Sequence, residues 1–325
     1  MAETLVPGPA LAGRAALPLR ERRRGQTLAA GLRRHRYLYL MLVPPFAYFL
    51  IFRFYPILGN VIAFKEYRLA DGIWGSAWVG LKHFETLFAD EAFWRALRNT
   101  VAIAGLKLLF AFPAPIVLAL FINEVRSLLY KRFLQTIVYA PHFLSWVIYG
   151  AILYIVLSPV NGVVNNVIAA LGFEKLPFFQ IPFLFQPIVV ASTILKESGW
   201  AAVIYLAAIS SIDPQLYEAA QIDGANRWQL MRHVTLPGLA IVIMTLLLLQ
   251  LGWFLNVGFA QLFILQNNIV LPAGDIIETF IYRVGIQRAR FDFTTAAGLV
   301  NSSVGLVLVL AADRTAKRMG LRGIL

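Results

Sequence analysis

Six long apolar stretches constrain the fold of this chain more than any other feature of its sequence. A helical crossing of a lipid bilayer needs about 20 mostly apolar residues, and lipid offers no hydrogen-bond partner to an unpaired backbone group. Only 14% of the 325 residues are charged, whereas soluble domains average roughly 25%. The sequence therefore predicts an all-α integral membrane protein with six transmembrane helices. The predicted crossings are 37–64, which holds Pro44 and Pro45 and is interpreted as kinked, 97–123, 133–157, 185–210, 236–259 and 293–312.

The positive charges indicate how these crossings are oriented. The net charge is +12, and most basic residues fall in alternate connections, as the positive-inside rule describes for cytoplasmic loops. Both termini are therefore predicted to be cytoplasmic, and the charge is interpreted as topology and contact with anionic lipid rather than nucleic acid binding. Arg283, Arg288 and Arg290, in the last opposite loop, run against this pattern. The predicted cytoplasmic basic residues are Arg20, Arg22, Arg23, Arg24, Arg33, Arg34, Arg36, Arg126, Lys131, Arg132, Arg227, Arg232, Arg314, Lys317, Arg318 and Arg322.

By composition the chain divides into a tail and a membrane domain. Residues 1–36 form a basic cytoplasmic tail, which is expected to be partly disordered because its first part is small and aperiodic. No cleaved signal peptide is predicted there. Residues 37–325 form the six-helix domain. Between its first two crossings, an aromatic segment is expected to fold as a small external cap with an interfacial helix starting near Gly80.

The loop between the fourth and fifth crossings, residues 211–237, is far longer than a simple connector needs to be. Asp213 followed by Pro214 is a typical helix start, since aspartate caps the helix and proline suits its first position. Gly224 is suited to end that helix in a left-handed turn. A second short helix follows, and Leu236-Pro237 is expected to end it before the next crossing. The loop is therefore predicted to be two short helices with a sharp corner at the membrane surface; a plain amphipathic anchor is the alternative.

Part of this loop matches the EAA motif, E-A-A-x3-G-x9-I-x-L-P, of ABC importer permeases. Glu218-Ala219-Ala220 and Gly224 stand at the motif's spacing, and Val234-Thr235-Leu236-Pro237 completes it with valine in place of isoleucine. The chain thus resembles a family in which this loop forms a coupling helix that docks into a groove on an ATPase subunit. The resemblance implies that Glu218 faces basic residues of the ATPase and that the small side chains permit close approach. The implied coupling residues are Tyr217, Glu218, Ala219, Ala220, Asp223, Gly224, Ala225, Trp228, Leu236 and Pro237.

The resemblance extends over nearly everything after residue 36. The segments FKEYRLADGIWGSAWVGLKHFETLF, YAPHFLSWVIYGAIL, LSPVNGVVNN and YRVGI are similar to carbohydrate importer permeases of the branch associated with polysaccharide fragments, including acidic ones such as alginate. It implies a multi-pass inner-membrane subunit of the ABC type I importer fold that works by alternating access. The implied partners are a second homologous permease subunit, two ATPase subunits and a periplasmic or extracellular solute-binding protein. The external cap is expected either to touch that binding protein or to cover its own bundle as a lid.

No catalytic role is predicted for the chain itself. A phosphate-binding loop requires glycine directly before its lysine, and none of the seven lysines follows a glycine. His35, His83, His142 and His233 lack the spacing of a metal site, and no G-x-S-x-G elbow occurs. We therefore expect no cofactor on this chain, with ATP and magnesium on the partner ATPase.

Polar residues in and beside the fourth and fifth crossings predict a path for a sugar. Charges inside a membrane are costly, so Lys196 and Glu197 each need a reason. One reason is an ion pair within the bundle, with a kink or close packing at Gly199; the other is a wet cavity, in which a cation such as Lys196 favours an anionic oligosaccharide. In the family that the chain resembles, the fourth and fifth crossings line the central cavity, although the tryptophans also suit packing or an interfacial belt. The predicted path residues are Lys196, Glu197, Trp200, Tyr205, Trp253, Asn256 and Gln261.

Three alternatives remain open at this level. The first is a permease for neutral oligosaccharides. The second is a secondary transporter, which should show internal repeats and midplane carboxylates; no clear repeat is found, and Glu197 is the main candidate acid. The third is a signalling or scaffold protein whose loop binds a different partner. Copurification of an ATPase separates the last two from an ABC permease.

Overall fold

The structure is a computed structural model, of which we describe residues 35–318. It divides into two compact units, Met1–Leu58 and Gly59–Leu325, and each is described by itself. Nearly all of the predicted basic tail, residues 1–36, lies outside the described residues.

Six crossings can be assigned to the described residues, as the sequence predicts. Four helices are long and apolar enough to span a membrane, and two bent helix pairs qualify when each pair is taken as one crossing. The four are Arg36–Phe64, Glu91–Glu124, Pro182–Ser210 and Phe291–Ala311, and the pairs are Leu128–Phe143 with Trp146–Val156 and Arg227–Gly238 with Ala240–Gly252.

The described part of the first unit is the start of the first crossing. Helix α2 continues through Pro44 and Pro45 before the chain passes into a π-turn. The elements are α2 (Arg36–Phe49), η1 (Leu50–Phe54) and α3 (Tyr55–Ile57), and the 3₁₀ segment η2 (Leu58–Phe64) follows.

Three of the crossings share one local device, a π-turn that ends two residues before a proline. Proline inside an α-helix clashes with the carbonyl four residues earlier, and a π-turn widens the helix at that point. The pairs are Leu50–Phe54 with Pro56, Lys107–Ala111 with Pro113, and Met231–Thr235 with Pro237. Each helix therefore passes its proline without ending.

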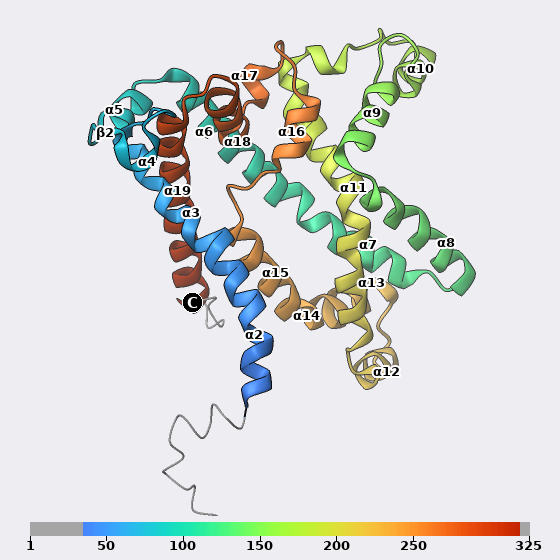
Figure 1. The fold of residues 1–325 in the computed structure, drawn as a ribbon. Helices are drawn as coiled ribbons and strands as arrows, with labels where there is room; N and C mark the ends of the chain where they lie inside the picture. The colour runs from blue at the N-terminus through green and yellow to red at the C-terminus, as the bar shows by residue number, and fades with distance from the viewer. Residues whose placement is uncertain (1–34, 319–325) are drawn as a thin grey trace, which may run out of the picture. The chain divides into compact units, whose positions relative to one another are not determined.

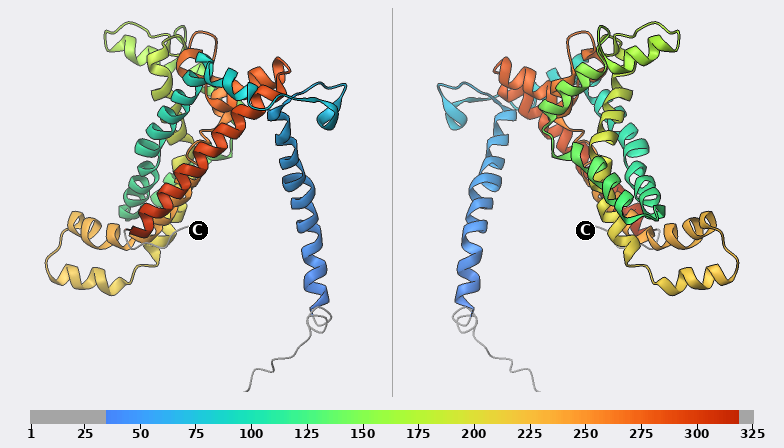
Figure 2. Two further views of the ribbon diagram at one scale, coloured as in Figure 1. Left: turned by 90° about the vertical axis from the view of Figure 1, so that its left-hand side faces the viewer. Right: turned by 90° about the vertical axis from the view of Figure 1, so that its right-hand side faces the viewer.

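In the second unit, the crossings run up and down between two ends (Figure 1). The cap and the short helices α5, α10 and α17 lie at one end, and α12 lies at the opposite end in all views (Figures 1 and 2). The crossing elements are α6 (Glu91–Leu106), η3 (Lys107–Ala111), α7 (Pro113–Glu124), α8 (Leu128–Tyr139), η4 (Ala140–Phe143), α9 (Trp146–Val156), α11 (Pro182–Ser210), α13 (Arg227–Leu230), η6 (Met231–Thr235), α14 (Leu236–Gly238), α15 (Ala240–Gly252) and α19 (Phe291–Arg318).

The elements outside the crossings are α12, at one end of the second unit, and a group of short elements toward the other end. A two-stranded antiparallel hairpin, with Lys65 opposite Trp78, forms the core of the cap, and α5 follows two residues after Gly80. This confirms the expected ordered cap and its helix near Gly80. The elements are β1 (Lys65–Glu66), α4 (Gly72–Gly75), β2 (Ala77–Trp78), α5 (Lys82–Phe88), α10 (Val163–Ala170), η5 (Phe178–Gln180), α12 (Pro214–Ile222), α16 (Phe259–Leu265), α17 (Leu271–Gly274), α18 (Ile277–Ile281) and η7 (Tyr282–Gln287).

Two crossings differ from the prediction. The third, predicted as continuous over 133–157, bends by 108° between Phe143 and Trp146. Pro141 lacks a backbone N–H, Leu144 is extended, and Ser145 starts α9 anew by accepting a hydrogen bond from the Ile148 N–H at 3.3 Å. A hydropathy window detects the apolar content of this segment but not the break.

The fifth crossing is displaced from its predicted range of 236–259. Leu236-Pro237 does not end the preceding helix, because the π-turn η6 carries it past Pro237, and the chain bends by 56° only after Gly238. The helix then ends at Gly252. Residues 253–258, which the sequence predicts to belong to the crossing, are not helical, and Gly258 has a φ of 98°.

Helix α11 lies at the centre of the packed core. It contributes Phe185 and Val189 to a cluster with α9 and α16, and Ala202 and Tyr205 to a cluster with α7. Gly199 is the point of closest approach to α8, since a Cβ atom there would lie 1.8 Å from the Val138 carbonyl oxygen. The predicted packing role of this glycine is therefore confirmed.

Arg283, which runs against the charge pattern of the loops, is held in a buried ion pair. Its two guanidinium nitrogens donate to the Asp275 carboxylate at 2.8 and 2.6 Å, and Asp275 is fully buried. The Asp275 carboxylate raises the pKa of Arg283. The charge of this arginine is therefore offset by that of the buried Asp275.

Candidate functional site

The predicted helical corner between the fourth and fifth crossings is present in the structure. The Asp213 carboxylate accepts a hydrogen bond from the Gln215 N–H at 2.9 Å and so caps α12, with Pro214 at the first helical position. At the other end, the Ala225 N–H donates to the Ala220 carbonyl and the Gly224 N–H to the Gln221 carbonyl. This is a Schellman ending, which needs a left-handed residue, and Gly224 has a φ of 82°.

The corner is fixed by polar contacts on its inner side. The Tyr217 hydroxyl lies 3.0 Å from Thr235 Oγ1, which joins α12 to the buried side of η6. Asn226 and Gln229 form a capping box that starts α13. The hydrogen bond between Tyr217 and Thr235 thus joins α12 to η6, and the capping box fixes the start of α13.

The outer side of the corner is exposed. Ile222 is 87% and Trp228 64% exposed, and Glu218 and Ala219 also lie open to the surface. Isolated exposed apolar residues need no explanation, whereas several on one protruding corner indicate a binding surface. Of the predicted coupling residues, the exposed ones are Glu218, Ala219, Asp223, Gly224, Trp228, Leu236 and Pro237, and the half-buried ones are Tyr217, Ala220 and Ala225.

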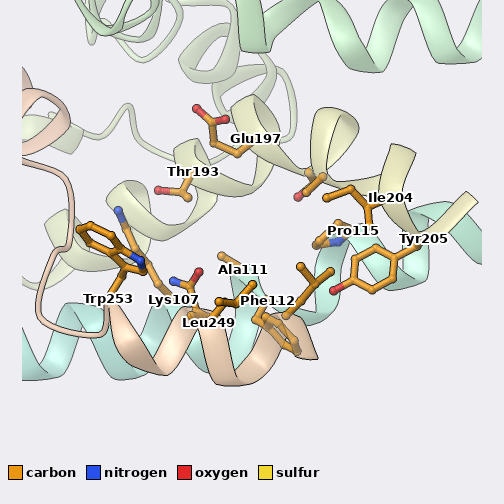
Figure 3. A pocket seen from close by; sticks show the side chains of 14 residues that line it. Lys107, Ala111, Phe112, Pro115, Thr193, Glu197, Ile204, Tyr205, Leu249 and Trp253 are labelled. Carbon is orange, nitrogen blue, oxygen red and sulfur yellow. The ribbon is translucent and has the colours of Figure 1, made fainter. Parts of the chain in front are cut away.

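A cavity of about 420 Å³ lies between the second, fourth and fifth crossings (Figure 3). This volume is in the range of small-ligand pockets. Trp253 and Lys107 lie at one end and Tyr205 at the other, with Glu197 and Thr193 on the α11 wall (Figure 3). The lining residues are Lys107, Ala111, Phe112, Pro115, Thr193, Glu197, Ser198, Ala201, Ile204, Tyr205, Leu246, Leu249, Gln250 and Trp253.

Three of the seven predicted path residues line this cavity, namely Glu197, Tyr205 and Trp253. The adjacent Lys196 does not: it is 4% exposed, and its ammonium lies 3.1 Å from Glu197 Oε1 and donates to the His142 carbonyl at 2.8 Å. Glu197 Oε2 lies 2.6 Å from His142 Nδ1. The ion pair within the bundle is therefore present, and the cavity wall carries Glu197 rather than the cation Lys196, which the sequence predicts to favour an anionic sugar.

This ion pair is located at the break in the third crossing. His142 belongs to η4, and its ring stacks on Trp200 with centroids 4.9 Å apart. Trp200 is half exposed and does not line the cavity. The charged groups of α11 therefore hold the bend of the neighbouring crossing.

Gln261 and Asn256 do not line the first cavity, although Gln261 Oε1 accepts a hydrogen bond from Lys107 on its wall. Gln261 is 1% exposed, and its amide nitrogen donates to the Val189 carbonyl at 2.8 Å, so it joins α16 to α11. Asn256 lines a second cavity, of about 440 Å³, together with Trp253, Glu278 and Asn301. Burial raises the pKa of Glu278, which lies outside the membrane crossings. The assignment of all seven residues to a substrate path stays a prediction.

The sequence reasoning missed Lys107, Thr193 and Gln250, all on the cavity wall. Lys107 had a detectable signal, since it is a charge inside an apolar run, which is the criterion that selected Lys196. Thr193 and Gln250 had none, because only the fold brings their helices together.

Comparison with known proteins identifies the family. A family model described as the binding-protein-dependent transport system inner membrane component matches residues 111–320. The chain belongs to this family. The match includes the corner and, except for Lys107, every residue of the cavity wall.

Two relatives of this permease come from Bacillus subtilis (strain 168). Protein LplB is 42% identical over 301 residues, which cover 93% of this chain and 95% of the relative. The polygalacturonan/rhamnogalacturonan transport system permease protein YteP is 44% identical over 289 residues, covering 89% and 90% of the two chains.

Solved structures extend the likeness to the fold. A chain in the crystal structure of a bacterial ABC transporter involved in the import of the acidic polysaccharide alginate superposes on the permease with a TM-score of 0.84 at 45% identity, covering 90% of this chain and 98% of that one. A second crystal structure, of a bacterial alginate ABC transporter in complex with an alginate pentasaccharide-bound periplasmic protein, gives a TM-score of 0.85 at 45% identity. The predicted ABC importer permease fold is thereby confirmed.

Proposed function

We propose that this permease forms part of the membrane pathway of an ATP-driven importer for acidic oligosaccharides, with alginate fragments as the first candidates. The proposed complex contains a second homologous permease, two ATPase subunits that carry ATP and magnesium, and an external solute-binding protein. Both termini lie in the cytoplasm in this scheme, on the side of the α12–α13 corner.

The observation that carries this proposal is the pairing of an exposed corner with an internal cavity on the same two crossings. The corner connects α11, through α13 and α14, to α15, and both α11 and α15 contribute to the cavity wall. A movement of the corner would therefore act on two walls of the cavity. An alternating-access transporter needs such a bistable element that an external partner biases.

The choice of an acidic substrate is supported by similarity to relatives. Both solved structures concern alginate transporters, and one of them names alginate as an acidic polysaccharide. YteP is named for polygalacturonan, whose sugar units by their chemistry also carry carboxylates. A permease for neutral oligosaccharides is the alternative to be tested.

The deciding experiment measures ATPase activity of the reconstituted complex with loaded binding protein. Alginate oligosaccharide is compared with maltooligosaccharide, and wild type with Glu218→Lys and Gly224→Pro. Proline cannot adopt the φ of 82° at Gly224 and lacks the N–H that donates to the Gln221 carbonyl. We expect stimulation by alginate only, and its loss in both variants while the complex still assembles.

Two outcomes would contradict the proposal in different ways. Normal stimulation in both variants would make the corner a membrane anchor rather than a coupling element. Stimulation by the neutral sugar alone would keep the importer but change its substrate class. A secondary transporter is excluded if the ATPase copurifies with the chain.

A further inference from the structure

Lys107 is a half-buried cation that has no counterion among the described residues. It begins the π-turn η3 in the second crossing and lines the 420 Å³ cavity. Its ammonium donates to the Val257 carbonyl at 2.7 Å and to Gln261 Oε1 at 2.6 Å, which are both neutral acceptors. Within the part of the chain that the structure describes it forms no ion pair, although an ammonium has three donors.

The other intramembrane lysine shows what compensation looks like. Lys196 is within 3.1 Å of a Glu197 carboxylate oxygen, and it lies 5.2 Å from the centre of the Trp146 ring. It is 4% exposed and does not line the cavity. The ion pair therefore accounts for the charge of Lys196, whereas no described residue accounts for the charge of Lys107 in this way.

Two carboxylates act on Lys107 at longer range, and neither forms an ion pair with it among the described residues. Glu197 is already paired with Lys196 and contacts His142. Glu278 forms no ion pair with Lys107 in the described structure, and burial raises the pKa of its carboxyl group. A positive charge in a low-dielectric wall without a partner is costly, and an anion in the cavity removes that cost.

We propose that Lys107 binds a carboxylate of the transported sugar, so that the cavity selects a uronate unit over a neutral one. The inference rests on the proposed importer function and assigns the specificity of its pathway to one side chain. Val257 and Gln261 hold the ammonium on the wall through their oxygen atoms. The Trp253 ring, at the same end of the cavity, offers a flat face for the sugar ring (Figure 3).

The test measures sugar binding to the purified importer complex in nanodiscs, without binding protein, so that the selectivity of that protein does not enter. The probes are an alginate tetrasaccharide and the same tetrasaccharide with its carboxylates reduced to alcohols, both at millimolar concentration. Wild type should prefer the acidic probe. Lys107→Gln should weaken binding of the acidic probe ~10-fold or more, since a charge-assisted contact is lost, and change binding of the reduced probe little.

Two further variants keep the test decisive. Lys107→Arg preserves the charge and should retain the preference for the acidic probe, even if Lys107→Gln fails to fold. Lys82→Gln makes the same change on an exposed cap lysine whose side chain is 60% exposed, and should alter neither affinity. Equal weakening of both probes by Lys107→Gln would assign this lysine a structural role only.

The result also separates this inference from the proposed function. If alginate-loaded binding protein stimulates the ATPase but wild type binds both probes equally, or binds neither, the role of Lys107 is overturned and the importer function stands. If that stimulation is absent in the same preparation, the proposed function fails. A preference for the acidic probe that disappears only in Lys107→Gln supports the inference.

Discussion

The corner at residues 211–237 and the cavity behind it are built in opposite ways. The polar contacts that shape the corner join residues close in the chain, from the Asp213 cap to the bond between Tyr217 and Thr235, 18 residues apart. In the cavity, Lys107 bonds to residues 150 and 154 positions away. The corner is formed by local contacts and is exposed on the surface, whereas the cavity exists only once the whole bundle has assembled.

This difference predicts how the two regions respond to mutation. In the cavity wall, charges and close helix contacts are buried, so a change there should reduce stability. At the corner most of the predicted coupling side chains are exposed, so a change there should affect the proposed coupling while the fold persists.

The largest expected effect lies at the contact behind the cavity. Gly199→Val should destabilise the permease by about 3 kcal/mol or more, because the new side chain would overlap the Val138 carbonyl oxygen. Thermal unfolding of the purified protein measures this. Gly105→Ala, in α6, is the control and should be neutral or slightly stabilising, because a Cβ atom there would meet no other atom within 4 Å. A stable Gly199→Val protein would show that α8 and α11 do not pack as described.

The next effect concerns the ion pair at the bend. Glu197→Gln leaves the 4% exposed Lys196 without its carboxylate and should cost about 3 kcal/mol. Glu66→Gln breaks the exposed pair with Lys82, at 3.8 Å, and should cost less than about 0.5 kcal/mol. Thermal unfolding again measures both variants. Equal losses would mean that the intramembrane pair is no more buried than the surface one.

Apart from the controls, the smallest effect on stability is expected at the corner. Gly224→Ala should cost only about 1 kcal/mol, since its φ of 82° disfavours a side chain but no atom lies within 4 Å. Stimulated ATPase activity should nevertheless fall, because a distorted corner no longer fits its partner. Gly224→Asn should be intermediate, as asparagine tolerates this conformation. If activity follows stability across all these variants, the contrast between the two regions is wrong.

The same contrast explains what the sequence predicts well. The caps and the turn of the corner follow from Asp213, Pro214 and Gly224 alone, because each acts on its own backbone neighbours. The number of crossings follows from hydropathy, which needs no tertiary contact. The coupling role given to these residues stays a prediction.

Other features depend on contacts that no local pattern contains. Gln261 is a polar residue near the predicted membrane path. In the fold, however, its amide nitrogen donates hydrogen bonds to α11 and so joins α16 to that helix. Lys107 has the same sequence character as Lys196, and only the structure shows which of them faces the cavity. Pro237 has the signature of a helix end, which the preceding π-turn cancels.

Those π-turns have a consequence for how related chains should be aligned. A π-turn accommodates one extra residue by widening a single turn, so the helix on either side keeps its faces, whereas one residue added to regular α-helix turns everything beyond it by about 100°. Deleting a single residue from Lys107–Ala111 would therefore restore regular α-helix and leave the faces of α6 and α7 in place, and the same holds for Met231–Thr235. In this permease, a gap of one position inside a π-turn leaves the same side chains facing the cavity, and a gap elsewhere in these helices changes them.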